Sequence, residues 1–212
     1  MRCALFDLDN TLYPQGAGVM ETVSQRISDY MVVRLGMDWA TVNELRPRYW
    51  HQYGTTMRGL LEEHQIEAED YLAYVHDFAV EELLAPNREL DDVLAGLPWR
   101  KAIFTNSTHE HARDVLVALG IERHFERVFD VRTTGYVGKP HATAYRFVIH
   151  ALGVGAEHTV VIDDSLPNLC TARELGMVTV LVGATDKAED VDFAIARIED
   201  VAAVARQMQA QH

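Results

Sequence analysis

Two acidic residues near the start of the chain have the types and spacing of a catalytic pair. Asp7 and Asp9 directly follow the apolar run Cys3–Phe6. Such a run indicates a buried strand, and residues two apart on a strand point the same way, so both carboxylates would face one side. We interpret the pair as the floor of a metal-dependent phosphoryl-transfer site. A D-x-D after a strand can also form a simple polar turn, so other residues must decide between these interpretations.

Further polar residues follow later apolar runs in the same way. Thr105 and Asn106 come after the run 101–104, Asp163 and Asp164 come after the run 159–162, and Lys139 precedes a predicted helix. In an open parallel sheet, ligands bind outside the carboxyl ends of the strands, so these residues would gather at one edge. Carboxylates crowded there would repel one another unless a cation held them. Oxygen ligands of this kind suit Mg²⁺, which accepts a substrate phosphate as a further ligand.

The elements that would position these residues alternate from residue 90 onward between short apolar strands and helices. The predicted strands are 101–104, 125–129, 159–162, 178–182 and 193–196, and the predicted helices are 107–119, 140–153, 166–175 and a C-terminal segment. This alternation is typical of a Rossmann-like α/β fold, in which helices cover both faces of a parallel sheet. Ser107 and Glu110 would form a capping box where the helix 107–119 begins.

The segment between the first two strands has a different pattern. Helical periodicity over 19–35, 38–53, 60–64 and 69–84 leaves no convincing strand between residues 14 and 86. Asp38 is the expected N-cap of the second helix, which Pro47 would split or kink. A crossover between neighbouring parallel strands commonly needs only one helix. We therefore predict an all-helical cap domain over 14–86, inserted after the first strand of a core domain formed by 1–13 and 87–212.

Composition narrows the possible partners. The chain has 212 residues, 48% of them hydrophobic, and a formal net charge of -13. A strongly acidic chain is a poor partner for a nucleic acid polymer, but a small anionic substrate stays possible where a metal ion and a lysine reverse the local charge.

Cys3 and Cys170 are expected to be reduced thiols, although a single disulfide is also open. We find no apolar membrane span and no signal peptide, and expect a cytoplasmic protein. The sequence does not indicate an oligomeric state.

With its strand-end motifs in this order, the core resembles the haloacid dehalogenase-like superfamily of phosphatases. The four motifs of that superfamily are matched here by Phe6-Asp7-Leu8-Asp9-Asn10-Thr11-Leu12, Phe104-Thr105-Asn106, Lys139-Pro140 and Val161-Ile162-Asp163-Asp164-Ser165. Each motif alone is weak, and the four together at strand ends are specific. Dehalogenases of the superfamily resemble the chain less, because Asp9 supplies an acid/base group that phosphate ester cleavage uses.

This resemblance implies a mechanism with a covalent intermediate. Asp7 would attack phosphorus to form an aspartyl-phosphate, and Asp9 would protonate the leaving oxygen and then activate water. Thr105 would hydrogen-bond a phosphoryl oxygen, and Lys139 would neutralise developing charge and orient Asp7.

The resemblance also implies a set of Mg²⁺ ligands. They would be the Asp7 carboxylate, the Asp9 backbone carbonyl and Asp164. Asp163 would reach the metal directly or through water, and we expect Asp164 to be the direct ligand.

The cap has a finer resemblance to the pyrimidine 5'-nucleotidase branch. It rests on Leu12-Tyr13-Pro14, on Tyr53-Gly54-Thr55-Thr56-Met57-Arg58-Gly59-Leu60, and on 103–107 followed by His111-Ala112. The substrate implied is a nucleoside monophosphate such as UMP or CMP, hydrolysed to nucleoside and phosphate. Thr55, Thr56 and Arg58 are candidates to face the nucleotide, together with Asn106 of the second motif. Alternatively, Gly54-Thr55-Thr56 is only a turn between helices, with Thr as N-cap.

Other interpretations stay open. Because cap residues set specificity, the substrate could instead be a sugar phosphate, phosphoglycolate or another small ester. A phosphomutase is less well supported, and the rival from another class is a non-catalytic regulatory or binding protein on the same fold.

Several other side chains are expected to have structural roles. We expect His109 and His111 to be surface or capping groups. The aromatic residues Tyr49, Trp50 and Tyr53 are expected to pack the core of the cap rather than stack on a base.

Overall fold

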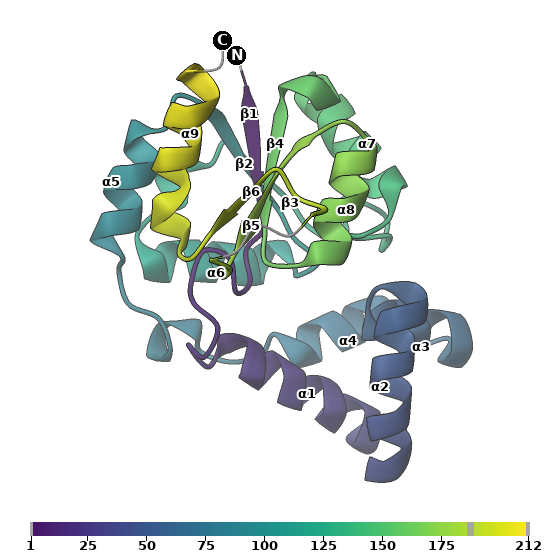
Figure 1. Ribbon diagram of the computed structural model, residues 1–212. Coiled ribbons are helices and arrows are strands. Elements are labelled where there is room, and N and C mark those ends of the chain that lie inside the picture. Colours follow the sequence, from purple (N-terminus) through teal and green to yellow (C-terminus); the bar gives the residue numbers. More distant parts are fainter. Residues whose placement is uncertain (1, 186–188, 211–212) are drawn as a thin grey trace.

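A single parallel sheet forms the centre of the protein. The computed structural model describes residues 2–185 and 189–210. Within these residues the sheet has six parallel strands in the order β3-β2-β1-β4-β5-β6 (Figure 1). Their bounds are β1 Cys3–Phe6, β2 Arg100–Phe104, β3 Arg127–Phe129, β4 Thr159–Asp163, β5 Val178–Val182 and β6 Phe193–Ile195. The predicted parallel α/β sheet is thereby confirmed, with β1 central between β2 and β4.

Helices cover both faces of the sheet because its strands are apolar on both sides. On one face α5 (Arg88–Gly96), α6 (His109–Leu119) and α9 (Val201–Ala210) pack against residues such as Ala4 and Phe6 of β1. On the other face α7 (Ala142–Leu152) and α8 (Leu166–Glu174) pack against Cys3 and Leu5. Successive residues of β1 therefore alternate between two cores, as the pleat of a strand requires. Short 3₁₀ helices complete the core, η2 (Glu122–His124), η3 (Ala156–His158) and η4 (Ile198–Asp200).

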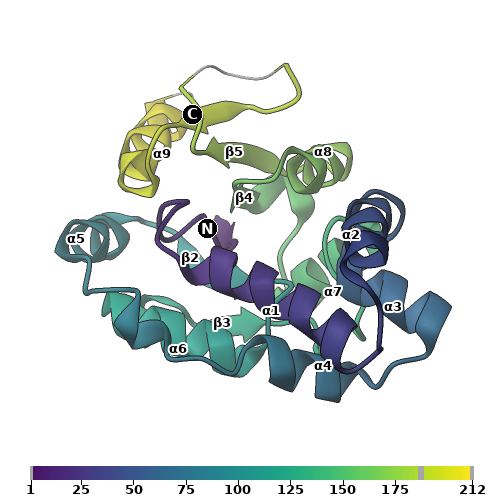
Figure 2. The same cartoon turned by 90° about the horizontal axis from the view of Figure 1, so that it is seen from below.

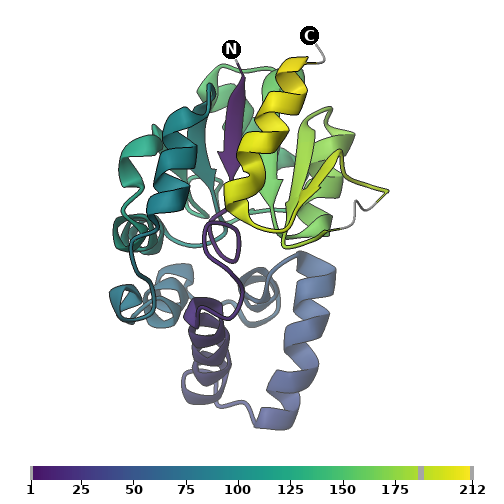
Figure 3. The ribbon, with the colours of Figure 1, turned by 60° about the vertical axis from the view of Figure 1, so that its left-hand side comes forward.

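The segment between β1 and α5 forms a separate helical layer at the carboxyl ends of the strands. Its elements are α1 (Val19–Val33), α2 (Trp39–Tyr53), α3 (Thr56–His64), α4 (Ala68–Val75) and η1 (Val80–Glu82). Figure 3 shows this layer below the sheet, joined to it by the chain that leaves β1 and by the chain that enters α5, and Figure 2, seen from below, has the layer in front of the sheet. The layer has its own buried core, which includes Tyr30, Met31, Tyr49 and Leu72. The predicted inserted helical cap is confirmed, and the division at residues 13/14 and 86/87 stays a prediction.

Local details differ from the predictions in two places within the cap. Pro47 lies inside a continuous α2, so the predicted split is wrong, and the alternative of a kink stays a prediction. Asp38 caps the start of α2 as predicted, by accepting from Thr41 N at 2.8 Å, and Tyr49 beyond the proline is buried in the cap core. The predicted helix 69–84 ends at Val75, and only η1 follows it.

Two expectations about the whole chain can be compared with the structure. Both cysteines are free, with Cys3 buried and Cys170 partly buried, so the expected reduced thiols are confirmed. Among the described residues, no helix is both long enough and apolar enough to cross a membrane.

Candidate active site

The carboxyl ends of the three central strands bring the predicted polar residues together. Asp7 follows β1, Thr105 follows β2, and Asp163 is the last residue of β4. Because β1 lies between β2 and β4 in register, these three residues are neighbours across the sheet. Lys139 comes from the long connection between β3 and α7, and its side chain is buried. The gathering of strand ends predicted from the sequence therefore occurs.

Lys139 joins two of the acids. Its Nζ donates to Asp7 Oδ1 at 2.6 Å and to Asp163 Oδ2 at 2.7 Å. Burial opposes the charge of this lysine, but the two carboxylates outweigh that effect and raise the pKa of Lys139 above its ordinary value. The ammonium group is thus a fixed positive charge beside the Asp7 carboxylate.

Asn106 holds the lysine in place through its backbone. The Asn106 side chain donates to Lys139 O at 2.9 Å and accepts from Lys139 N at 2.8 Å. Gly138 is needed for this contact, because a Cβ at that position would overlap the Asn106 carboxamide. Asn106 lines the cavity at this site, but its amide is engaged by the protein. Its predicted contact with substrate stays a prediction, and the structure adds a positioning contact to Lys139.

Three carboxylates lie close enough to share a cation. Oxygens of Asp7, Asp163 and Asp164 are within 4.8 Å of one another. Burial raises the pKa of Asp7, the neighbouring Lys139 lowers it, and the other acids raise it further, so the net shift is upward. Burial and the charge of Asp163 likewise raise the pKa of Asp164. Burial and repulsion between the acids thus disfavour the ionised forms of Asp7 and Asp164.

Asp163 and Asp164 differ in how freely they could bind a metal. The Asp163 carboxylate is fully buried and accepts from Lys139 Nζ, from Ser165 N at 2.9 Å and from Asn168 Nδ2 at 3.0 Å. Asp164 is only partly buried. Asp164 as the direct ligand, with Asp163 binding directly or through water, stays a prediction.

Asp7 and Thr105 have local hydrogen bonds that set their orientation. Thr11 lies four residues after Asp7 and donates from Oγ1 to Asp7 Oδ2 at 3.0 Å. The buried Thr105 accepts from Ser107 N at 3.0 Å through its hydroxyl oxygen, which leaves the hydroxyl hydrogen available.

The second acid of the pair has a different environment. Asp9 accepts from Tyr13 Oη at 2.6 Å and from Ser107 Oγ at 2.5 Å, and its Oδ1 lies 3.1 Å from His111 Nε2. Burial alone would raise the pKa of Asp9, but the contacts with His111, Ser107 and Tyr13 outweigh burial and hold it well below its ordinary value. The two acids therefore differ in charge preference, which is the pattern expected of two carboxylates with different tasks.

Sequence reasoning missed the residues that surround Asp9. We expected His111 at the surface or as a cap, and this is wrong, because it is 2% exposed and touches Asp9. The predicted capping box of Ser107 is also wrong. Thr108 caps α6 by accepting from His111 N at 3.2 Å, which frees the Ser107 hydroxyl for Asp9. The sequence did contain a signal for the burial of His111. It lies on the same helix face as the apolar residues Val115 and Leu119, which point to the core.

We predict that replacing His111 lowers turnover without unfolding the protein. His111→Ala removes one of three groups that orient Asp9, and we expect kcat to fall by roughly 10- to 100-fold on a phosphate ester substrate. The matched control is His109→Ala on the same helix, because the His109 side chain is exposed, and its kcat should stay within about twofold of the parent. Thermal melting checks that both variants fold. Equal kcat values for the two variants would contradict a role for His111 beside Asp9.

A cavity of about 290 Å³ lies between the strand ends and the cap. Asp7, Asp9, Thr105, Asn106 and Lys139 line its core side. On the cap side, the predicted residues Thr55 and Thr56 also line it. Thr55 is in addition the N-cap of α3, because its Oγ1 accepts from Arg58 N at 3.1 Å. The two interpretations of this turn are therefore compatible.

Other cap residues lie differently from what we expected. Arg58 does not line this cavity, and its guanidinium pairs with Glu62 at 2.5 Å. Tyr49 is buried in the cap core as predicted, and Tyr53 is partly buried. Trp50 is 58% exposed and lines the cavity, so its predicted packing in the cap core is wrong.

An ion-pair cluster ties the cap to the core beside the cavity. Arg132 of the core donates to Glu69 of α4 through Nε at 2.8 Å and also pairs with Glu110 at 2.6 Å. Tyr136 donates to the same Glu69 carboxylate at 2.7 Å. These contacts hold α4, and with it one wall of the cavity, over the carboxyl ends of the strands.

Comparisons with known proteins agree with this architecture. The chain is 26% identical over 194 residues to phosphate metabolism protein 8 of Saccharomyces cerevisiae, a match that covers 83% of the chain and 60% of the yeast protein. It therefore spans less than two thirds of that relative. It is 25% identical over 217 residues to the glyceraldehyde 3-phosphate phosphatase of Methanocaldococcus jannaschii, covering 89% of each.

A solved structure and a family-wide sequence pattern extend the comparison. The magnesium-bound HAD-hydrolase YfnB of Bacillus subtilis superposes with a TM-score of 0.65 at 17% identity, over 97% of this chain and 98% of that one, which shows a shared fold. The sequence model of the haloacid dehalogenase-like hydrolases matches residues 1–176. Because this match covers most of the chain, the protein belongs to the haloacid dehalogenase-like hydrolase family.

Proposed function

We propose that the protein is a Mg²⁺-dependent phosphomonoesterase that works through an aspartyl-phosphate, and that it is a pyrimidine 5'-nucleotidase acting on UMP or CMP. One observation supports the chemistry above all: Asp7 lies in the cavity wall beside the buried Lys139 ammonium and two further carboxylates. A nucleophile, a fixed positive charge and oxygen ligands for a cation are the parts that phosphoryl transfer needs.

The first half of the reaction forms the covalent intermediate. An Asp7 carboxylate oxygen bonds to phosphorus as the bond between phosphorus and the ester oxygen breaks. Asp9 must carry a proton to give to that leaving oxygen, whereas its hydrogen bonds favour the ionised form before substrate binds. A substrate dianion beside Asp9 disfavours the ionised form and thus favours uptake of this proton. The nucleoside then leaves as an alcohol.

The second half restores the enzyme. Ionised Asp9 takes a proton from water, and the water oxygen attacks phosphorus of the aspartyl-phosphate. The bond between phosphorus and Asp7 breaks, which releases inorganic phosphate and the free carboxylate. Lys139 beside Asp7 and the Thr105 hydroxyl stabilise the negative phosphoryl oxygens in both halves.

The donor set fits Mg²⁺. The Asp7 and Asp164 carboxylates and the Asp9 backbone carbonyl would hold the ion, all of them oxygen ligands, with Asp163 alongside. The raised pKa values of Asp7 and Asp164 leave room for added positive charge. When bound, Mg²⁺ supplies charge that offsets repulsion between the phosphate dianion and the acids.

We predict that Mg²⁺ stabilises the protein and does so more at about pH 8 than at about pH 5. Without metal, the raised pKa values of Asp7 and Asp164 mean that the folded state binds more protons, so stability falls as pH rises above about 4 through the raised values. Mg²⁺ binds the ionised carboxylates and recovers this loss. At 100 times its Kd it should add about 2.7 kcal/mol, or about 5–10 °C in Tm.

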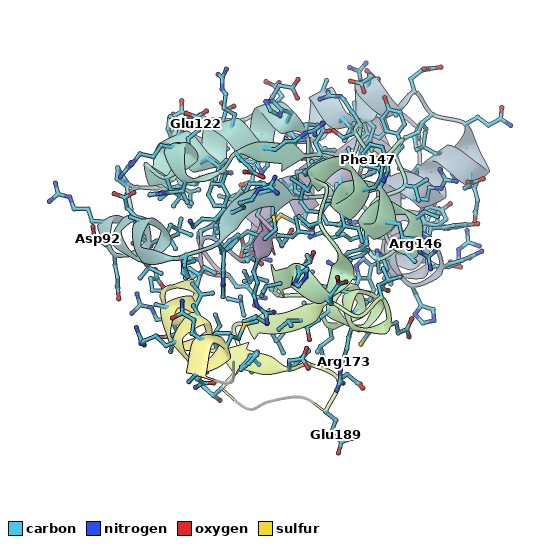
Figure 4. The ribbon with its side chains drawn as sticks, turned by 90° about the horizontal axis from the view of Figure 1, so that it is seen from above. Asp92, Glu122, Arg146, Phe147, Arg173 and Glu189 are labelled. Atoms are coloured by element: carbon cyan, nitrogen blue, oxygen red, sulfur yellow. The ribbon has the colours of Figure 1, made fainter. Side chains whose placement is uncertain are left out.

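A pair of matched substitutions makes this prediction specific. Asp164→Asn should abolish most of the Mg²⁺-dependent rise in Tm. Asp92→Asn should leave the rise intact, because Asp92 is exposed on α5, at the outer surface of the core (Figure 4). Thermal melts with Mg²⁺ and with EDTA at both pH values measure the difference. A rise in Tm that is the same at both pH values, or the same in both variants, would count against a metal site at these acids.

The choice of substrate rests on the cap side of the cavity. The glyceraldehyde 3-phosphate phosphatase among the relatives makes a small sugar phosphate the second candidate. Against it, most cap residues that line the cavity have aliphatic or aromatic side chains, and apart from Gly54 the others are Thr55, Thr56, Arg46 and His76. The hydroxyls of a sugar would find few hydrogen-bond partners on such a wall, which would weaken binding. A nucleobase has apolar faces that can pack against the wall.

A phosphate-release assay tests the proposal. UMP, CMP, purine monophosphates, glyceraldehyde 3-phosphate and phosphoglycolate would be compared at equal concentration, with Mg²⁺ and with EDTA. We expect Mg²⁺-dependent release with the highest kcat/KM for UMP or CMP. Equal values for every ester would contradict the nucleotidase assignment. No release from any ester, including an aryl phosphate, would contradict the phosphatase assignment and favour a non-catalytic protein.

A further inference from the structure

One arginine of the cap differs from the others in its partners. The segment 14–86 contains twelve acidic residues and five arginines. Four of the arginines pair with acids within the cap: Arg26 with Asp77, Arg34 with Asp70, Arg48 with Glu63 and Arg58 with Glu62. Among the described residues, Arg46 has no carboxylate partner. An arginine without a carboxylate partner is unusual in a segment with so many acidic residues.

The neighbours of Arg46 fix its guanidinium without neutralising it. Nη1 donates to Ser24 O at 3.0 Å and to Ser28 Oγ at 2.8 Å, and Nη2 donates to Ser24 Oγ at 2.9 Å. These bonds use three of the five N–H donors. Nε is buried and has no partner in the described part of the chain. Burial also lowers the pKa of Arg46, which means that the charged guanidinium has lost favourable contact with water. An acceptor for its unpaired donors would offset part of that loss.

Arg46 also lies in the wall of the cavity that contains Asp7 and Lys139. The remaining cap wall is mainly apolar, and its members include Met20, Val23, Ile27, Met57, Leu72 and Val75. Trp50 lies one helical turn after Arg46, lines the same cavity and is 58% exposed, so much of its indole is free for contact. The cap side therefore combines flat and apolar surface with one positive donor group.

We propose that Arg46 is a specificity residue whose guanidinium donates to acceptor oxygens on the leaving group, and that the substrates are phosphate monoesters whose leaving group carries a flat, oxygen-bearing ring. Pyrimidine nucleotides belong to this class. The inference rests on the proposed phosphatase function, because it places phosphate at Asp7 and the leaving group toward the cap. A site that hydrogen-bonds a substrate group discriminates strongly against an analogue without it, because its donors are then left unpaired.

Two substrates with the same reacting ester isolate the ring. UMP and ribose 5-phosphate both carry phosphate on the 5' oxygen of ribose, and only UMP has the ring with its carbonyl oxygens. We expect the parent to have the higher kcat/KM for UMP. Arg46→Gln should lower the ratio of the two kcat/KM values at least tenfold, mainly through KM for UMP. Arg46→Lys should recover part of the ratio, because it keeps the charge and loses the planar donors.

The matched control is Arg48→Gln, on the same helix. Arg48 is exposed, pairs with Glu63 and does not line the cavity, so the ratio should stay within about twofold of the parent. A brace between α1 and α2 is the other role that Arg46 could have. Loss of a brace would lower activity on both esters equally and leave the ratio unchanged, and that result would overturn the inference.

Phenyl phosphate separates failure of this inference from failure of the proposed function. If the parent hydrolyses phenyl phosphate with Mg²⁺ while Arg46→Gln leaves the UMP ratio unchanged, the inference about Arg46 is wrong and the phosphatase assignment stands. A parent that prefers ribose 5-phosphate to UMP would also overturn the inference. If the parent hydrolyses none of the three esters, the proposed function fails, and the inference fails with it.

Discussion

Asp7→Asn is expected to lower kcat/KM for an aryl phosphate by at least about 10⁴-fold at saturating Mg²⁺. The substitution keeps the shape of the side chain and replaces the attacking oxygen with a poorly nucleophilic carboxamide. It also removes the negative partner of Lys139, whose Nζ lies 2.6 Å from Asp7 Oδ1. The loss corresponds to about 5 kcal/mol of transition-state stabilisation, more than we expect from any other single substitution in the site. Initial rates with a chromogenic ester measure it directly.

The control for Asp7→Asn is the same change at an exposed position. Asp92→Asn should retain the activity of the parent within about twofold. Melting curves should show that both variants fold, since Lys139 keeps Asp163 as a partner when Asp7 is changed. If Asp7→Asn hydrolysed the aryl ester as fast as Asp92→Asn, attack by Asp7 would be excluded.

Asp9→Asn is expected to have the second largest effect, and the size of that effect should depend on the leaving group. With UMP, whose leaving alcohol needs a proton, kcat should fall by about 10²- to 10⁴-fold. With an aryl phosphate, the leaving group departs without help, so Asp7 is still phosphorylated. The second half then stalls, because the carboxamide that replaces the Asp9 carboxylate cannot take a proton from water. A rapid first turnover followed by slow steady release of the phenol is the expected time course.

The burst must scale with enzyme to count as evidence for the stalled intermediate. Stopped-flow traces at several concentrations of the Asp9→Asn variant should give an amplitude that approaches one phenol per active site. The parent enzyme under the same conditions should show a smaller burst or none. A linear trace for the variant, with phenol release slowed from the first turnover, would contradict separate acid and base tasks for Asp9.

The arrangement of the core was predictable because its signals are local and repeated. Each strand contains a short apolar stretch, and polar residues end or follow the three central ones at Asp7, Thr105 and Asp163. The rule that parallel strands present their carboxyl ends at one edge then brings these residues together. Lys139 was included because it precedes a predicted helix and matches a motif, although nothing local shows that it turns inward to two acids.

The surroundings of Asp9 were not predictable from local pattern. Ser107 and Thr108 are both acceptable helix caps, and only the fold decides between them. Thr108 caps α6, because the Ser107 hydroxyl is drawn to Asp9, 98 positions earlier in the chain. His111 is directed inward by the same helix. The residue pattern of α6 alone does not indicate that Ser107 and His111 have a partner in Asp9, which follows a strand far away in the sequence.

The cap arginines show a related limit and a missed signal. We selected Arg58 because it belongs to the segment 53–60 that resembles the nucleotidase branch. Glu62 lies four residues later, however, a spacing that favours an ion pair on a helix. That spacing was readable from the sequence and counted against Arg58. Arg46 has its partners Ser24 and Ser28 on a different helix. Its position in the cavity wall follows only from the packing of α1 against α2.

The central claim is that phosphate passes through a bond to Asp7, and one measurement tests it most directly. The Asp9→Asn variant would be mixed with an aryl phosphate and Mg²⁺, quenched in acid during the burst, digested and analysed by mass spectrometry. The account predicts one added phosphoryl group on the peptide that contains Asp7, lost on treatment with hydroxylamine. A phosphoryl group on another residue, or an unmodified protein despite a full burst of phenol, would contradict it.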